Sequence, residues 1–154
     1  ITLQGRHDTY PKRRGLTRVP ELLAAGVNVG FGHDCVMDPW YALGSGCMLE
    51  VAAMGLHVAQ MTSEAAQRQC FDAVTVNNAR ILGLQGYGLE PGCRADFLLL
   101  QARSPQEAIR LRAQRLLVVR GGQVLSRMAP ATAELSLTGR PAQVDFTRQT
   151  PPPV

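Results

Sequence analysis

Residues 26–40, with the sequence GVNVGFGHDCVMDPW, constrain the fold of this chain more than any other segment. Their apolar first part predicts a short buried strand over residues 27–31. The strand leads to Asp34, and β/α barrels place catalytic or metal-binding groups at such strand ends. A lone strand leaves both of its edges unpaired, so the segment requires neighbours. No second cluster of metal ligands accompanies Asp34 elsewhere in the sequence.

The length of 154 residues suits one core with a small appendage. It is too short for a complete eight-stranded β/α barrel, which needs about 250 residues. The chain opens on Ile1 rather than Met, so we expect it to be processed or to be a piece of a longer protein. It shows no pattern of a signal peptide and no apolar run of membrane-spanning length. A soluble, cytoplasmic protein that does not bind membranes is therefore expected.

The net charge of +4 raises the question of nucleic-acid binding. The basic residues are scattered, and no aromatic residues are interleaved with them as in single-strand binders. We therefore expect no nucleic-acid partner. The four cysteines form no C-x-x-C pair and no zinc-finger spacing, which favours mostly buried free thiols; they are Cys35, Cys47, Cys70 and Cys93.

The first half of the chain is helical apart from the one strand. Pro20 in a first turn and Gly26 as a stop delimit one short helix. Thr62 or Ser63 is expected to cap the third helix, and Thr75 the fourth. The predicted helices cover residues 18–25, 44–60, 64–70 and 76–82.

The second half, from Gly86 onward, has the pattern of a small sheet. Apolar runs predict strands at residues 95–100, 116–119 and 124–126, the last two joined as a hairpin across Gly121 and Gly122. Ser104, Pro105 and Glu107 form a capping box that predicts a helix to about residue 111. The tail from residue 140 is rich in proline and is expected to be extended or disordered.

Six segments in one register resemble the bacterial cytosine deaminases of the amidohydrolase superfamily. The DPWY and DTYPKRRG blocks are fairly specific to that family, whereas the pattern of residues 88–96 is shared more widely. The resemblance extends from residue 1 to about residue 146. The six segments are residues 3–6 (LQGR), 8–15 (DTYPKRRG), 31–34 (FGHD), 38–41 (DPWY), 54–57 (MGLH) and 119–122 (VRGG).

The resemblance implies an α/β fold that corresponds to the C-terminal part of a (β/α)8 amidohydrolase barrel, with part of a small β-sandwich domain. Residues 1–85 would supply the last strand and helices of the barrel, and residues 27–32 would be its eighth strand. Residues 86–140 would supply the C-terminal part of the sandwich, followed by a proline-rich tail at 141–154. The chain would cover about the last third of such an enzyme.

The resemblance implies that Asp34 is both a metal ligand and a catalytic residue. It would bind one divalent ion, iron or zinc, and take a proton from the metal-bound water before passing it to the leaving amine. The other ligands, a His-x-His pair and further histidines, would lie in a missing N-terminal segment of the same enzyme. From spacing alone, Asp34 reads equally well as an acid that caps its loop.

Two further residues are predicted to contact the substrate, a pyrimidine-like small molecule. Trp40 would line the pocket with its flat ring, or alternatively pack at the barrel rim. Cys35 stands where cytosine deaminases carry a second acid, so the substrate is cytosine or a related amino-heterocycle; its role as a nucleophile is disfavoured because no base lies beside it. Asp38 is expected to brace the loop, and His33 to orient or pack rather than to bind metal.

The opening loop would border the pocket mouth, where Arg6 or Asp8 either reaches substrate or forms an Arg–Asp brace or a subunit contact. Neither His7 nor His57 is expected to be a ligand. The family likeness implies a homo-oligomer. The sequence thus predicts a deaminase whose isolated chain is inactive and binds little metal. The alternative is a non-catalytic truncated product or companion subunit of an amidohydrolase.

Overall fold

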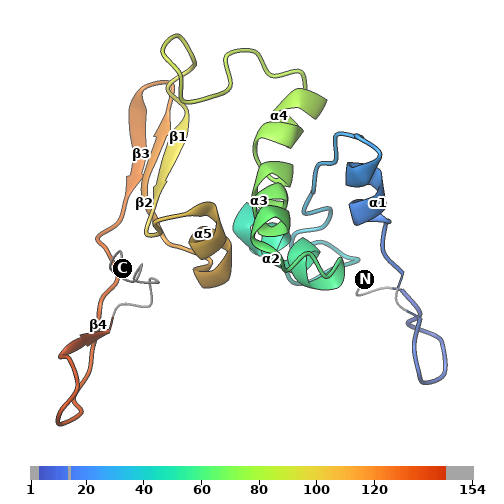
Figure 1. The fold of residues 1–154 in the computed structure, drawn as a ribbon, viewed down its shortest axis with the longest axis horizontal. Coiled ribbons are helices and arrows are strands. Elements are labelled where there is room, and N and C mark those ends of the chain that lie inside the picture. The colour runs from blue at the N-terminus through green and yellow to red at the C-terminus, as the bar shows by residue number, and fades with distance from the viewer. Residues whose placement is uncertain (1–3, 14, 145–154) are drawn as a thin grey trace, which may run out of the picture. The chain divides into compact units, whose positions relative to one another are not determined.

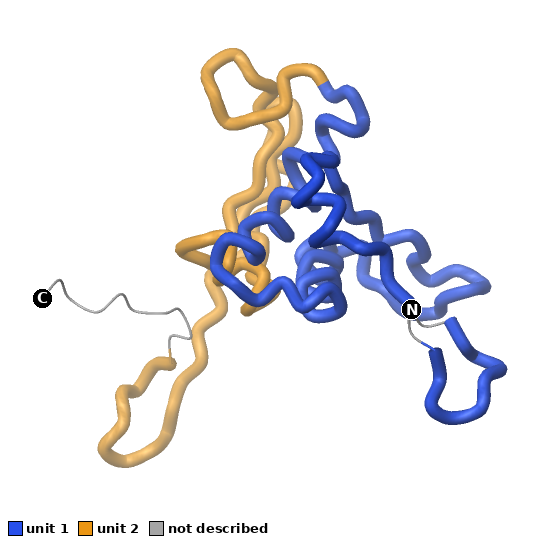
Figure 2. The backbone as a smooth tube through the Cα atoms, turned by 45° about the vertical axis from the view of Figure 1, so that its right-hand side comes forward, with its two compact units in different colours: residues 1–84 blue, residues 85–154 orange. Residues whose placement is uncertain are grey.

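The computed structural model describes residues 4–13 and 15–144, and it divides the chain into two compact units. Unit 1 is Ile1–Leu84 and unit 2 is Gln85–Val154 (Figure 2). The secondary structure is mixed α/β. Unit 1 contains helices, and unit 2 contains one helix, a three-stranded sheet and a two-stranded sheet among the described residues. Within the described ranges, no helix combines the length and the hydropathy that crossing a bilayer requires.

Four helices make up the regular structure of the described part of unit 1, and local signals mark the ends of two of them. Pro20 lies in the first turn of the first helix, and Gly26, with φ of +76°, follows its end. Ser63 accepts a hydrogen bond from the amide of Ala66 at 3.2 Å and so caps the third helix. The helices are α1 (Val19–Ala24), α2 (Met48–Val58), α3 (Glu64–Ala73) and α4 (Val76–Ile81) (Figure 1).

Two details of the predicted helices are wrong. Helix α2 begins at Met48 rather than near residue 44, because Gly44 and Gly46 both adopt positive φ, which a right-handed helix excludes. Thr75 does not cap α4 through its side chain. Its hydroxyl instead donates to the carbonyl oxygen of Phe71 at 2.8 Å, a bond back into the preceding helix.

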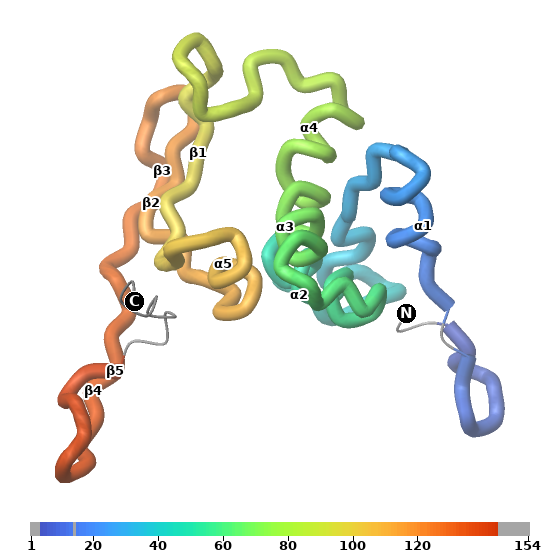
Figure 3. Tube along the Cα trace, viewed as in Figure 1, coloured from blue at the N-terminus to red at the C-terminus, as the bar shows by residue number. Residues whose placement is uncertain are grey.

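Residues 27–31, predicted as a strand whose neighbours lie outside this chain, form no β-ladder within the described residues. They run as an extended segment between α1 and α2 (Figure 3). The amide of Phe31 donates to the carbonyl oxygen of Ala73 at 2.8 Å. Side-chain amides of Asn77 and Asn78 donate to the carbonyl oxygens of Val29 and Phe31 at 2.9 and 2.7 Å. Helix side chains thus satisfy the carbonyls that a neighbouring strand would otherwise pair.

Close packing against the extended segment requires two glycines. A Cβ on Gly30 would lie 2.0 Å from the Oδ1 of Asn78, and a Cβ on Gly55 would lie 2.5 Å from the ring of Phe31. The buried core of the unit consists mainly of small and medium apolar side chains. They are Val19, Leu49, Ala52, Ala53, Met61, Cys70, Ala73, Val74 and Ala79.

Unit 2 contains an antiparallel sheet of order β1-β2-β3, formed by β1 (Phe97–Leu100), β2 (Arg115–Arg120) and β3 (Gln123–Arg127). The predicted hairpin is confirmed: Gly121 and Gly122 both have positive φ, as a type I′ turn demands. Asp96 secures this turn by accepting a hydrogen bond from the Gly121 amide at 2.5 Å. A shorter ladder pairs β4 (Ala133–Glu134) with β5 (Gln143–Val144).

Helix α5 (Pro105–Leu111) occupies the residues that its capping box predicts. The Ser104 hydroxyl accepts from the Glu107 amide at 3.2 Å, and the Glu107 carboxylate accepts from the Arg103 amide at 3.0 Å. The small core of this unit lies around Ala108, Ile109, Ala113 and Val119. Of the predicted tail, residues 145–154 lie outside the described part of the chain.

Candidate functional site

A cavity of about 570 Å³ lies in unit 1 against the extended segment. Apolar side chains from α2, including Val51, Met54 and Val58, form part of its wall. Its volume falls within the range of small-molecule sites, which are mostly apolar with a few placed polar groups. The polar side chains of the lining are Gln4, Thr17, His33, Asp34, Cys35, Tyr41 and Glu50.

Asp34 reaches this cavity from a strained turn. The amide of Cys35 donates to the carbonyl oxygen of His33 at 3.0 Å, and the φ of Asp34 between them is +65°. A hydrogen bond from residue i+2 to residue i across a positive φ is the pattern of the classic γ-turn, which is rare and strained. Such strain at a carboxylate that lines a cavity is typical of functional sites. The carboxylate is also exposed to solvent.

Asp38 braces the loop that follows, as the sequence predicts. Its Oδ1 accepts from the backbone amides of Trp40 and Tyr41, both at 2.9 Å. The amide of Met37 donates to the carbonyl oxygen of Leu43 at 2.9 Å, which closes the loop at its base. The carboxylate of Asp38 is therefore committed to holding residues 37–43 in one conformation.

Cys35 is a neutral thiol in this setting. Its interaction with the Asp38 carboxylate, together with desolvation and the charge of Asp34, raises its pKa to about 11. The same hydrogen bond, with those from Tyr41 and Trp40, lowers the pKa of Asp38. A thiol with so high a pKa is a poor nucleophile near neutrality, which agrees with the reading from sequence. No disulfide joins the four cysteines, and only Cys70 among them is buried rather than half-buried.

Trp40 does not line this cavity. The residue is 68% exposed, and it belongs to the loop that Asp38 braces. The structure thus brings Asp34 and Cys35 together at the cavity and leaves Trp40 outside its wall. The catalytic and metal-binding role of Asp34 and the substrate contacts of Cys35 and Trp40 stay predictions.

The opening loop is held by its own charged side chains. Arg13 donates from Nε and Nη2 to the two carboxylate oxygens of Asp8 at 2.6 and 2.7 Å. The ammonium of Lys12 donates to the backbone carbonyls of Gly5, Arg6 and Asp8. This is the Arg–Asp brace that the sequence offered as one reading of Asp8.

Sequence reasoning missed Glu50, which lines the cavity and accepts a hydrogen bond from the Ser45 hydroxyl. Ser45 also accepts from the amide of Cys47 at 3.2 Å. The sequence carries no signal for this pair, because a capping box needs serine or threonine three residues before the glutamate, and that position is Cys47.

Asp34 stands without a set of companion ligands in the part of the chain that the structure describes. No group of three or more His, Cys, Asp or Glu side chains there is arranged to hold a metal ion. His57 is engaged through Nδ1 with the carbonyl oxygen of Ala53 at 2.6 Å. A carboxylate in an exposed turn suits one ligand position of a divalent ion, and the remaining positions need other residues.

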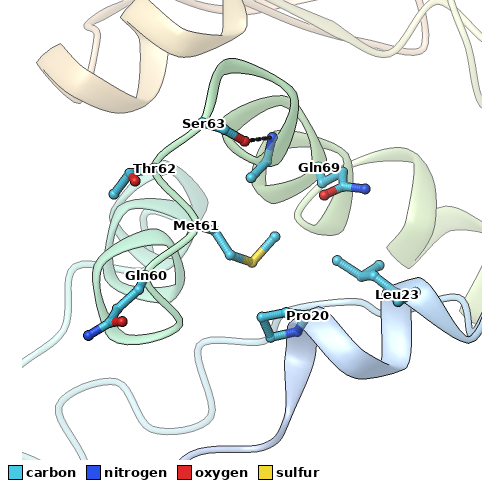
Figure 4. A pocket seen from close by; sticks show the side chains of 9 residues that line it. Pro20, Leu23, Gln60, Met61, Thr62, Ser63 and Gln69 are labelled. Carbon is cyan, nitrogen blue, oxygen red and sulfur yellow. Dashed lines mark hydrogen bonds between the residues drawn. The ribbon is translucent and has the colours of Figure 1, made fainter.

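A second cavity, of about 420 Å³, lies in unit 1 away from Asp34. Figure 4 shows Met61 pointing into it, with Pro20 and Leu23 of α1 on one side and Ser63 and Gln69 on the other. Its lining contains no ionisable side chain. It therefore lacks the groups that acid–base or metal chemistry would need.

The fold and the site define the class of protein. Residues 1–126 match the model of the amidohydrolase family, so the chain belongs to that family. It is similar to 5-methylcytosine deaminase from Klebsiella pneumoniae, solved with 5-fluorocytosine, with a TM-score of 0.82 and 43% identity. That match covers 88% of this chain and 33% of the solved one.

Two curated relatives extend the range of chemistry. A pterin deaminase of Rhizobium rhizogenes is 36% identical over 86% of this chain and 30% of its own length. An N-isopropylammelide isopropyl amidohydrolase of Pseudomonas sp. strain ADP is 33% identical over 70% of this chain and 27% of its own. The chain thus spans about a third of the length of the proteins it matches. Its relatives hydrolyse carbon–nitrogen bonds, as their names state.

Proposed function

We propose that the protein containing this chain is a metal-dependent hydrolase that deaminates cytosine or a related amino-heterocycle. The observation that carries the proposal is the Asp34 carboxylate, held in a strained turn at a cavity, in a chain of the amidohydrolase family. In this proposal, unit 1 supplies the last strand and helices of a (β/α)8 barrel, and unit 2 part of a small β-sandwich.

The reaction consumes water and releases ammonia, so that a ring C–NH2 becomes a ring carbonyl with the proton moved to nitrogen. A divalent ion, iron or zinc, would supply an acidified water at near-neutral pH. Asp34 would be one ligand of the ion, and its carboxylate would accept a proton from water and pass it to the leaving amine. The other ligands come from an N-terminal segment of the same enzyme, because Asp34 has no companion cluster among the described residues.

Cys35 and Trp40 are proposed to set the choice of substrate. At neutral pH the Cys35 thiol is uncharged, since its pKa is raised to about 11. An uncharged, polarisable group beside a pyrimidine tolerates an apolar ring substituent better than a carboxylate would. The similarity to a 5-methylcytosine deaminase makes that base a natural substrate to test beside cytosine. Trp40 would stack on the ring from the braced loop.

We also propose that the complete protein is a cytoplasmic homo-oligomer. A second candidate role is that of a non-catalytic truncated product or companion subunit of an amidohydrolase. The two roles differ in whether the intact protein releases ammonia from any amino-heterocycle.

The test is ammonia release by the intact protein, loaded with Fe²⁺ or Zn²⁺, from cytosine, 5-methylcytosine and a pterin. We expect activity with at least one pyrimidine, and a loss of about a hundredfold or more in Asp34→Asn. Asp72→Asn, on α3 and outside the cavity lining, is the matched control. Undiminished turnover in Asp34→Asn rules the proposal out. The isolated chain is expected to release no ammonia and to show the same Tm with and without Zn²⁺.

A further inference from the structure

The residue before Asp34 is joined to the residue after it by two hydrogen bonds. In one, the amide of Cys35 donates to the carbonyl oxygen of His33 at 3.0 Å. In the other, Nδ1 of the His33 ring lies 3.0 Å from the carbonyl oxygen of Cys35. Both bonds bridge the same strained residue, whose φ is +65°. The imidazole thus closes a ring of contacts around the turn that presents the carboxylate.

The chemistry of this contact fixes the tautomer of His33. A backbone carbonyl only accepts hydrogen bonds, so Nδ1 must carry the proton. In the neutral ring, Nε2 is then a bare acceptor. Nε2 is buried and has no hydrogen-bond partner among the described residues. The single N–H of the neutral ring therefore donates to the carbonyl oxygen of Cys35.

The missing side chain of Gly44 leaves the room that the ring occupies. A Cβ at residue 44 would lie 2.6 Å from Cε1 of His33 and 3.4 Å from Nε2. The φ of Gly44 is +93°, a conformation that side chains with a Cβ rarely adopt. The base of the loop is thus shaped to seat the imidazole against the backbone.

We propose that His33 is a positioning residue, which holds Asp34 at the cavity by the Nδ1–H bond to the carbonyl oxygen of Cys35. The inference rests on the proposed function for its effect on catalysis, but its structural content stands on this turn alone. We call this hydrogen bond the clamp. Without it, the φ of Asp34 would relax from +65° towards the ordinary negative values, and the carboxylate would no longer point into the cavity. The His33 ring also lines the cavity, and its proposed role is to act through Asp34 by the hydrogen bond from Nδ1.

Two substitutions separate the effect of the hydrogen bond from the effect of removing the ring. In His33→Asn the amide nitrogen can take the place of Nδ1 and keep the donor. In His33→Gln the amide nitrogen reaches the place of Nε2 and the donor is lost. His57→Gln is the matched control, because Nδ1 of His57 also faces a backbone carbonyl, that of Ala53, and His57 does not line the cavity.

The first measurements need no catalytic activity. Long-range ¹H–¹⁵N spectra of the intact protein should show His33 with a protonated Nδ1 and an unprotonated Nε2. Hydrogen exchange of the Cys35 amide should be about tenfold faster in His33→Gln and near wild type in His33→Asn and His57→Gln. A proton on Nε2 alone, or equal exchange in the Asn and Gln variants, overturns the proposal.

Kinetics on the metal-loaded intact protein give the second reading. We expect kcat to fall about tenfold to a hundredfold in His33→Gln, with KM changed less than about threefold, because misplaced catalytic groups cost rate more than binding. His33→Asn should recover most of kcat. A loss shared equally by both variants overturns the positioning role. If wild type deaminates nothing, the proposed function fails, while the spectra and exchange still decide the clamp.

Discussion

The side-chain amide of Asn78 donates to the carbonyl oxygen of Phe31 at 2.7 Å, so a helix residue pairs the backbone three residues before Asp34. Asn77 does the same for Val29, and the carbonyl of Ala73 accepts from the amide of Phe31. The segment that leads to the candidate site is thus fastened by the α3–α4 corner. Loss of these contacts should loosen the segment and the turn that follows it.

The first prediction concerns Asn78→Ala. The substitution leaves a half-buried carbonyl without its donor, which costs about 1–3 kcal/mol in the free energy of unfolding. Urea denaturation followed by circular dichroism measures the change. Asn28→Ala is the matched control, because its bond to the carbonyl of Asn77 is exposed and 3.1 Å long. Equal losses in the two variants would mean that the extended segment is not held as described.

The second prediction concerns Gly55→Ala in the interior of α2. Helix propensity favours alanine over glycine by about 1 kcal/mol. The new Cβ would meet the ring of Phe31 at 2.5 Å, however, and overpacking of this kind costs about 1–3 kcal/mol. We expect net destabilisation. The double variant Gly55→Ala with Phe31→Leu should regain stability relative to the sum of the single changes. If the changes in the free energy of unfolding are additive, the Phe31 ring moves aside without cost and the expected clash does not occur.

These two contacts show where sequence reasoning succeeds and where it stops. The start of helix α5 and its approximate end were predictable, because the signals of Ser104, Pro105 and Glu107 are local and act through adjacent backbone groups. The extended segment was read as a strand from its apolar run alone. Strand pairing depends on distant partners, however, and Asn77 and Asn78 look in sequence like ordinary weak helix formers.

The candidate site divides in the same way. The bracing role of Asp38 follows from a local Asp–Pro pattern and is confirmed by its bonds to the amides of Trp40 and Tyr41. The left-handed turn at Asp34 has no signature in residue type, because aspartate adopts positive φ only occasionally. The entry of Glu50 into the cavity depends on how α2 packs, which residue order alone does not reveal.

The third prediction concerns the reactivity of Cys35. Its pKa rises from an ordinary value of 9.0 to about 11, so below pH 9 its thiolate fraction falls about a hundredfold. We expect slow alkylation by iodoacetamide at pH 8. Asp38→Asn should accelerate it, because the amide still accepts from the Trp40 and Tyr41 amides but no longer carries the charge that disfavours the thiolate. Mass spectrometry of the modified peptide reads the rates, and Cys35→Ser identifies the site. An unchanged rate in Asp38→Asn would exclude Asp38 as the cause.

The fourth prediction concerns Cys70, a fully buried residue of α3 whose Sγ lies 3.8 Å from Sδ of Met61. Desolvation raises its pKa in the folded state to about 11. Below about pH 9 the thiol is protonated in both the folded and the unfolded states, so it adds no pH dependence. Above that pH the unfolded state loses the proton first, and the free energy of unfolding falls until about pH 11.

Thermal unfolding between pH 8 and pH 10.5 tests this sign. The wild-type Tm should fall more steeply with pH than the Tm of Cys70→Ala. For one proton, the free energies of unfolding of the two proteins differ in slope by at most about 1.4 kcal/mol per pH unit. The variant should be less stable at pH 8, since it leaves a small void beside Met61. Its curve should then approach that of the wild type as the pH rises. Parallel curves would show that the thiol ionises as easily in the folded core as in water.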